Sequence, residues 1–163
     1  MIVRRIKSSE GDLIKELRIA AITDSALAFG ESLAEAEKRT KKEYESSAKL
    51  RAQSNTDAFF VAEDCNDCIG IIGAFFENDT NKPFISSMWV QPSKRKLKVG
   101  AKLFLTAKEW LFERGATKIH AWVAQDNIGA INFYTKLGFI ASKETNAMPN
   151  DSTRLETVFI YEI

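Results

Sequence analysis

The sequence lacks an excess of either charge. Its 163 residues contain 23 basic and 22 acidic side chains, which give a net charge of +1. Proteins that bind nucleic acid or membrane surfaces usually show a strong basic excess. The charge balance therefore argues against both kinds of partner.

Long hydrophobic runs are also missing. No apolar stretch approaches the roughly 20 residues that a membrane-spanning helix needs. The first residues, Met1 to Ile6, lack the apolar core of a secretory signal peptide. We therefore expect a cytoplasmic protein.

Metal-binding and redox residues are few, since the chain has two cysteines, Cys65 and Cys68, and one histidine, His120. A structural zinc site needs about four ligands, and no second cysteine pair is present to supply them. A thioredoxin-like pair should open a helix, whereas Asp64 to Gly70 has the composition of a turn between two strands. The pattern favours a hairpin turn that carries two thiols, and no metal site is expected.

The sequence does contain a regular series of strand-like and helix-like segments that fits a single domain over residues 1–163. Hydrophobic periodicity predicts, in order, a strand at 2–7, a helix from about 13 to 21, a polar helix from 32 to 51, strands at 58–63, 68–77 and 84–90, a helix from 99 to 114, a strand at 118–123, a helix at 128–137, an extended segment at 139–142, a polar loop at 146–152 and a last strand at 155–163. Hairpins come early, and a parallel crossover spans the helix that begins at Val99. The predicted fold class is α+β with a mixed sheet.

Capping residues mark the predicted helix starts. Ser8, Ser9 and Asp12 offer N-caps for the first helix. Ser32 and Glu35 have the spacing of a capping box, which predicts the start of the polar helix.

The stretch from Met88 to Leu103 joins a strand to a helix through a short basic loop that carries Lys94, Arg95 and Lys96. A helix N-terminus exposes unpaired backbone N–H groups and the positive end of the helix dipole. Both favour an anion, and phosphate is the usual one. Taken alone, the stretch is equally well interpreted as a solvated basic turn.

Two later stretches join this loop in one pattern. The loop runs Val90-Gln91-Pro92 and then Arg95-Lys96-Leu97-Lys98-Val99-Gly100. Downstream, the spacing Val-x-x-x-Asn-x-x-Ala-x-x-x-Tyr-x-x-x-Gly-Phe is matched by Val123, Asn127, Ala130, Tyr134, Gly138 and Phe139. Together the stretches resemble the GNAT superfamily of acetyl-CoA-dependent N-acetyltransferases. The motifs cover about residues 84–140, and the order of elements extends the resemblance loosely to the whole chain. It implies a GNAT-like fold, with a mixed central sheet of about six or seven strands flanked by about four helices.

The resemblance implies that acetyl-CoA is a co-substrate. Its pyrophosphate would lie on the N–H groups of residues 97–101, with Arg95 and Lys96 near the phosphates. The pantetheine arm would pair like an extra strand with residues 88–90. Asn127 would bind that arm, cap the short helix, or do both. The implied cofactor-binding residues are Met88, Trp89, Val90, Arg95, Lys96, Leu97, Lys98, Val99, Gly100, Ala101, Asn127 and Tyr134.

By the same resemblance, Tyr134 would protonate the departing CoA thiolate. A phenol of pKa about 10 and a thiol of about 8.5 are suitably matched. The alternative is a core tyrosine with a satisfied hydroxyl. His120, alone on a strand, is more typical of a structural histidine than of a base.

The general base is the least defined part of the pattern. Many relatives have a glutamate on the strand before the loop, where this chain has Ser86 and Ser87. The nearest acidic candidates are Glu77 and Glu31, and either is also consistent with a solvated surface acid. A mechanism in which water carries the proton away is a further alternative.

The chain departs from the family pattern at the first loop glycine, which is Lys98 here. If residue 98 keeps a helical φ, a lysine could add a phosphate contact. If it needs a positive φ, the loop would be distorted and CoA affinity would fall.

Acceptor recognition in this family usually involves the segments that correspond to Asp24–Ser32 and Lys143–Thr153. The first is apolar between Asp24 and Glu31, which suits an amine with an apolar body. We expect an N-acetyltransferase acting on a primary amine of a small molecule by direct attack on the thioester. The alternatives are acetylation of a protein N-terminus or lysine, and a non-catalytic CoA-binding module. The sequence leaves open whether the protein forms a homodimer.

Overall fold

The computed structural model describes residues 1–162, which form one seven-stranded sheet with five α-helices. The strands are β1 (Ile2–Arg5), β2 (Asp57–Asp64), β3 (Asp67–Phe76), β4 (Pro83–Val90), β5 (Lys118–Ala124), β6 (Ile140–Met148) and β7 (Asp151–Glu162). The helices are α1 (Gly11–Asp24), α2 (Leu33–Lys38), α3 (Lys41–Gln53), α4 (Val99–Phe112) and α5 (Ile128–Leu137), with 3-10 turns η1 (Ala26–Ala28) and η2 (Pro92–Lys94). The strand order is β1-β2-β3-β4-β5-β7-β6. Within these residues β4 and β5 form the one parallel pair, so the predicted mixed α+β sheet is confirmed.

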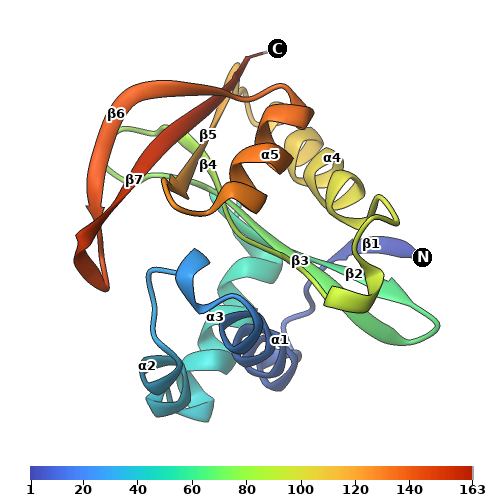
Figure 1. Ribbon diagram of the computed structural model, residues 1–163. Helices are drawn as coiled ribbons and strands as arrows, with labels where there is room; N and C mark the ends of the chain where they lie inside the picture. Colours follow the sequence, from blue (N-terminus) through green and yellow to red (C-terminus); the bar gives the residue numbers. More distant parts are fainter. Residues whose placement is uncertain (163) are drawn as a thin grey trace.

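The sheet is the middle layer of three, with α1, α2 and α3 on one face and α4 and α5 on the other (Figure 1). Successive side chains of β2 point to opposite faces of the sheet, so this strand packs against both helix layers. Ala58, Phe60 and Ala62 face α4, whereas Phe59 and Val61 face the N-terminal helices. This strand is buried on both faces, which explains why its sequence is almost continuously apolar.

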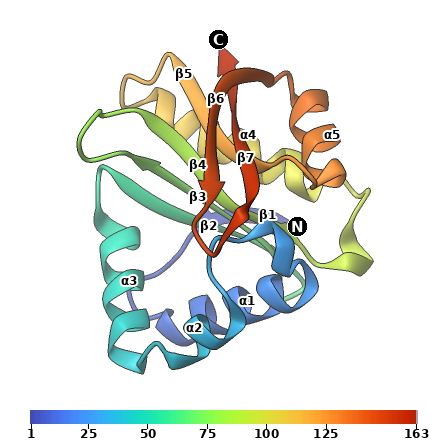
Figure 2. The same cartoon turned by 60° about the vertical axis from the view of Figure 1, so that its left-hand side comes forward.

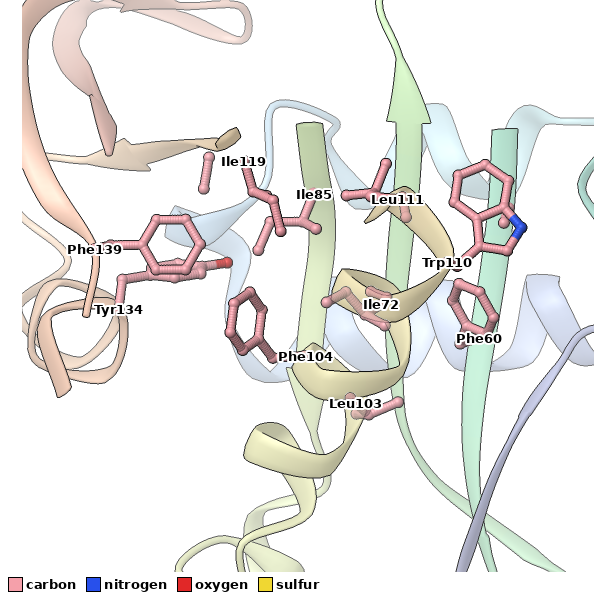
Figure 3. Close-up of a cluster of buried hydrophobic side chains, with 14 of the residues drawn as sticks. Phe60, Ile72, Ile85, Leu103, Phe104, Trp110, Leu111, Ile119, Tyr134 and Phe139 are labelled. Atoms are coloured by element: carbon pink, nitrogen blue, oxygen red, sulfur yellow. The ribbon is translucent and has the colours of Figure 1, made fainter. Parts of the chain in front are cut away.

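The larger apolar core lies between α4 and the sheet. Five residues along one side of α4 are buried against the sheet: Leu103, Phe104, Ala107, Trp110 and Leu111. Leu103 and Leu111 are fully inaccessible, so each contributes about 2 kcal/mol of hydrophobic stabilisation. Figure 3 shows Leu103, Phe104, Trp110 and Leu111 against the strands, with Phe139 and the α5 residue Tyr134 extending the same core.

Strands β4 and β5 barely pair. Phe84 and His120 are their one aligned pair among the described residues. Beyond that point the strands separate toward their carboxyl ends, while the other edge of β5 stays paired with β7 along its whole length. The sheet is therefore open in its middle, next to the loop that leads into α4.

The polar segment predicted as one helix from 32 to 51 is two helices, α2 and α3. The Ser32–Glu35 capping box is confirmed, and a second box formed by Thr40 and Glu43 starts α3. Thr40-x-x-Glu43 has the spacing that would have predicted this break. This split accounts for five α-helices where about four were expected.

Two other predicted boundaries are wrong. Glu10, not Ser8, Ser9 or Asp12, is the N-cap of α1, and no side chain caps the helix there. The Glu10 carboxylate instead accepts hydrogen bonds from the Lys7 N–H at 2.8 Å and from the Arg4 guanidinium at 2.8 and 2.9 Å.

The predicted loop at 146–152 is mostly strand. Met148 ends β6, Asp151 begins β7, and the two strands form a hairpin with a short turn. The polar residues of this hairpin are tolerated because β6 is the exposed edge strand of the sheet. The last residue of the predicted final strand, Ile163, lies outside the described residues.

The cysteine turn is confirmed. Cys65 and Asn66 connect β2 to β3 with φ of 50° and 71°, the left-handed pair that a two-residue hairpin turn requires. Both thiols are free. Among residues 1–162 no three His, Cys, Asp or Glu side chains gather as metal ligands. No helix in the same range is long and apolar enough to cross a membrane.

Candidate active site

A cavity of about 1100 Å³ fills the opening between β4 and β5. Its walls come from β4, the basic loop, the start of α4, the end of β5, and α5. Nearly all the cofactor-binding residues expected from the sequence line it: Met88, Trp89, Val90, Arg95, Lys96, Lys98, Val99, Gly100, Ala101, Asn127 and Tyr134. Leu97 is the exception, because its side chain is 61% exposed and lies outside the cavity.

A β-bulge shapes the β4 wall. The two-residue step from Ile71 to Gly73 on β3 lies opposite the three-residue step from Ser86 to Trp89 on β4. The extra residue is Ser87, whose φ is 54°. A bulge leaves a backbone group outside the regular ladder. Here the bulge lies in the cavity wall, where such groups can meet a ligand.

The basic loop ends with a left-handed residue. Lys98 has a φ of 61° and is the N-cap of α4, so the position does need the positive φ that glycine would supply. The helix nevertheless begins normally, since the Lys102 N–H bonds to the Lys98 carbonyl at 3.1 Å. No side chain caps α4. The first N–H groups of the helix are therefore available to an anion in the cavity.

Arg95 connects this loop to two other elements. Its Nε donates to the Val90 carbonyl at 3.0 Å, and its Nη2 donates to the Asp24 carboxylate at the end of α1. Asp24 also accepts a hydrogen bond from the Trp89 indole at 2.9 Å. These contacts, which span 71 residues of sequence, hold the loop over the carboxyl end of β4.

Gly100 has a packing role in addition to its place in the loop. A Cβ at this position would lie 3.0 Å from the Phe133 ring of α5. A larger residue would push α5 away from the start of α4 and widen the cavity between them. Asn127 caps α5 by accepting the Ala130 N–H at 3.0 Å, and it lines the cavity as well.

Tyr134 is the one tyrosine that lines the cavity. Its ring packs edge-on against Phe133 and Phe139, and its hydroxyl points from α5 toward the sheet (Figure 3). Burial raises the pKa of this phenol, and no charged neighbour contributes. The hydroxyl therefore keeps its proton at working pH, but the raised pKa makes it a weaker acid than a free phenol, so its match to a thiol of pKa about 8.5 is poorer than the sequence implies.

The two acids favoured by the sequence lie outside the cavity. The Glu31 carboxylate forms ion pairs with Arg18 at 2.8 Å and with Arg39 at 2.7 Å. Glu77 lies at the β3–β4 turn, where its carboxylate accepts the Thr80 hydroxyl proton. Neither carboxylate lines the cavity, so the structure does not bring either one to the Tyr134 hydroxyl.

His120 is also outside the cavity. Its Nδ1 lies 3.0 Å from the Pro83 carbonyl, and its ring packs on Phe84. The imidazole thus fixes the narrow end of the β4–β5 opening, in agreement with the structural interpretation.

Glu156 on β7 was not identified from the sequence. It is the one acidic residue among those that line the cavity within residues 1–162. It pairs across the ladder with Ala124 of β5, so both side chains are on the face opposite the α4 core. Burial raises the pKa of this carboxyl, and no cation offsets it. Sequence spacing gives no signal for Glu156, because its place depends on the β5–β7 register.

Two distant segments close the cavity on the acceptor side. Gly30 follows α1 and η1, and a Cβ there would lie 3.1 Å from Pro149 at the β6–β7 turn. The Asn150 amide donates to the Phe29 carbonyl at 3.0 Å, and Arg154 donates to the Leu27 carbonyl at 2.9 Å. Figure 2 shows the tip of the β6–β7 hairpin beside the segment after α1. These are the two segments expected to recognise the acceptor.

The sheet is mixed and opens at its parallel step, and an uncapped helix N-terminus lies at one end of the opening, an arrangement with room and hydrogen-bond donors for an extended anionic ligand. The sequence model of the Acetyltransferase (GNAT) family matches residues 23–139. The chain therefore belongs to the GNAT family of acetyltransferases.

Individual relatives agree with this assignment. An uncharacterised N-acetyltransferase of Methanocaldococcus jannaschii is 32% identical over 96 residues, a match that covers 56% of this chain and 42% of that protein. A GNAT acetyltransferase structure from Streptococcus pneumoniae has a TM-score of 0.82 at 15% identity, covering 99% of this chain and 98% of that one. The PaiA N-acetyltransferase of Thermoplasma acidophilum, solved with coenzyme A, has a TM-score of 0.75 at 20% identity, with 99% and 98% covered. The two structures show that the fold is shared.

Proposed function

We propose that this protein transfers the acetyl group of acetyl-CoA to a primary amine of a small molecule. The observation that carries the proposal is the continuous cavity between β4 and β5, which runs from the N-terminus of α4 to Tyr134 and Glu156. It combines an anion site, a strand edge and a proton donor in one opening of the sheet.

The residues present fit acetyl-CoA. The uncapped start of α4 would receive the pyrophosphate, and Lys96 and Lys98 line the same end of the cavity. The backbone of Met88 to Val90 offers a strand edge for the amides of the pantetheine arm, because β5 has separated from β4 there. Bound in this way, the thioester lies near the Ser87 bulge.

The side chains then divide the proton transfers between them. Glu156 takes a proton from the acceptor ammonium, which frees the nitrogen lone pair to form the new C–N bond. Backbone N–H groups at the Ser87 bulge stabilise the negative charge that develops on the carbonyl oxygen. As the C–S bond breaks, Tyr134 donates its hydroxyl proton to the sulfur. The second proton of the nitrogen restores the phenol by way of water, and Glu156 releases its proton to solvent.

The test combines a binding and a transfer measurement. Acetyl-CoA at about 100 times its Kd should stabilise the fold by about 2.7 kcal/mol, a rise in melting temperature of roughly 5–10 °C. A panel of amines and amino acids with acetyl-CoA should yield N-acetylated product and free thiol, measured by mass spectrometry and by thiol titration.

The outcome separates this proposal from a non-catalytic module. Thermal stabilisation by acetyl-CoA without product from any amine would favour a CoA-binding module. Product from peptides alone would instead favour acetylation of a protein N-terminus or lysine.

A further inference from the structure

A second, smaller cavity lies beside the first, on the face of the sheet that α1 and α3 cover. Its volume is about 260 Å³. Arg18, Phe75, Ser86 and Ser87 line both cavities, so the two share a wall at the β4 bulge. This side cavity is defined by ten residues: Ile14, Arg18, Arg39, Tyr44, Ser47, Arg51, Phe59, Phe75, Ser86 and Ser87.

Three arginines from three different elements converge on the side cavity. Arg18 comes from α1, Arg39 follows α2, and Arg51 comes from the last turn of α3. None of the residues that line it is acidic. The cavity is partly open, since the Arg39 side chain is 49% exposed, and its lining differs from that of an ordinary packing defect, which is apolar.

The carboxylates that pair directly with these arginines are fewer than the arginines. Arg18 and Arg39 share one carboxylate, that of Glu31. Arg51 lies 3.4 Å from Asp57, and burial raises the pKa of Asp57 although Arg51 opposes it. Three guanidinium groups therefore share two directly paired carboxylates, while the exposed Glu35 and Glu43 act on Arg39 at longer range. Arg18, which is largely buried, shares its one carboxylate with Arg39, so a bound anion would add the charge that this pair lacks.

The position of Arg18 connects this charge to the reaction. Its Nη1 donates to the Ser87 hydroxyl at 2.8 Å, and its guanidinium lies over the Phe29 ring at 4.9 Å. Arg18 is thus held between the bulge and the segment after α1, at the junction of the two cavities. A guanidinium presents a planar fork that suits a carboxylate.

We propose that the side cavity is an anion subsite and that the acceptor is an amine that also carries a carboxylate. The acceptor nitrogen lies toward Glu156 and the Ser87 bulge, and its carboxylate enters between Arg18, Arg39 and Arg51. The apolar rings of Phe29 and Trp122 in the main cavity surround the body of the molecule. This inference rests on the proposed acetyltransferase function.

The test compares matched acceptors that differ only in the acidic group. Phenylalanine, methionine, leucine and 4-aminobutyrate are each assayed against their carboxamides, and kcat/KM is measured for acetyl transfer. The α-amino group of an α-carboxamide is less basic than that of the amino acid, so more of it is neutral at pH 8. The intrinsic bias therefore opposes the expected result for the three α-amino acids. We expect the acid of the best pair to exceed its amide by about tenfold or more, as for a charge-assisted hydrogen bond.

Two variants locate the effect. Arg39→Gln and Arg51→Gln should each lower the acid-to-amide ratio of kcat/KM by about tenfold. Both values of kcat/KM in the ratio are measured on the same enzyme preparation, so any loss of folded protein lowers both equally and leaves the ratio unchanged. Lys49→Gln removes an exposed positive charge from α3 and should leave the ratio unchanged.

The failures are distinguishable. If amides are acetylated as well as acids in every pair, or if neither arginine variant changes the ratio, the anion subsite is wrong and the acetyltransferase function stands. If no acceptor is acetylated at all, the proposed function fails and the subsite inference fails with it.

Discussion

Tyr134 is the residue on which the proposed chemistry depends most. It is 7% exposed, its phenol has a raised pKa, and its hydroxyl points toward the sheet. Tyr134→Phe removes the proton donor and keeps the ring packing against Phe139. We predict that kcat falls about 100-fold while the Kd of acetyl-CoA stays within about twofold.

Tyr161→Phe is the matched control for that change. Tyr161 also packs on Phe139, but its hydroxyl accepts a hydrogen bond from Lys108 and does not line the cavity. It should keep the native kcat. An unchanged kcat in Tyr134→Phe would remove the tyrosine from the mechanism.

Glu156 should control the acid side of the pH profile. Because burial raises its pKa, the acid limb of kcat/KM should lie above the pH at which an exposed glutamate titrates. Glu156→Gln should lower kcat/KM about 100-fold and abolish that limb. Glu144→Gln, at an exposed position on β6, should retain the native profile. A Glu156→Gln profile with the native acid limb would assign the titration to another group.

The same burial has a consequence for stability. A carboxyl whose pKa is raised by folding favours the folded state while it is protonated, and this contribution is lost as pH rises through the folded pKa. Glu156→Gln removes the cost of burying the charge. We predict that the variant melts roughly 1–3 °C above the native protein at pH 8 and that the gain disappears at pH 4. A gain that is equal at both values would exclude linkage to this carboxyl.

Residue roles could be predicted from the sequence only where they follow a local motif. The basic loop, Asn127 and Tyr134 belong to one pattern, and the structure brings them to one cavity. Glu156 and the three arginines lie on strands and helices with no such spacing. They meet through the β5–β7 register and through the packing of α1 and α3, which depend on the whole fold.

At the scale of the elements, the backbone of the loop before α4 is strained at Lys98, and this strain can be tested. Lys98 has a φ of 61°, a left-handed conformation that costs a side-chain-bearing residue roughly 1–2 kcal/mol. Lys98→Gly removes that cost, partly offset by the greater freedom of glycine in the unfolded chain. We predict a melting temperature about 1–3 °C above that of Lys98→Ala.

Lys98→Ala is the appropriate reference because both variants lose the same positive charge. Only the backbone preference at position 98 differs between them. Equal melting temperatures for the two variants would show that the lysine is not strained in this loop.

Most element positions could be predicted because their boundaries carry local signals. The cysteine turn, the end of α5 at Gly138 and the start of α4 depend on neighbouring residues. The end of β6 and the start of β7 could not, because their polar sequence resembles a loop. This part of β6 is a strand because it pairs with β7, and the other edge of β7 pairs with β5.

For the whole molecule, the opening of the sheet predicts where a ligand changes backbone dynamics. Acetyl-CoA in the β4–β5 opening should slow amide hydrogen exchange at Met88–Val90 and at the first residues of α4. Exchange in the β1–β2 ladder, which lies at the edge of the sheet away from the opening, should be unaffected. Hydrogen exchange followed by mass spectrometry, with and without CoA, measures both regions. Protection that is absent from β4, or equal in both regions, would contradict the proposed position of the ligand.

The separation of β4 from β5 also changes how many edges the sheet has. An open sheet ordinarily exposes two, here β1 and β6, but the split adds two more inside the molecule. Unpaired strand edges are templates for pairing with other chains, and proteins usually protect them with charge, bulges or covering segments. The Ser87 bulge and the Arg95 side chain on the Val90 carbonyl do this along β4. Acetyl-CoA bound in the opening would cover the rest of the unpaired β4 edge and so reduce self-association. The protein should therefore be least prone to aggregate when acetyl-CoA is abundant.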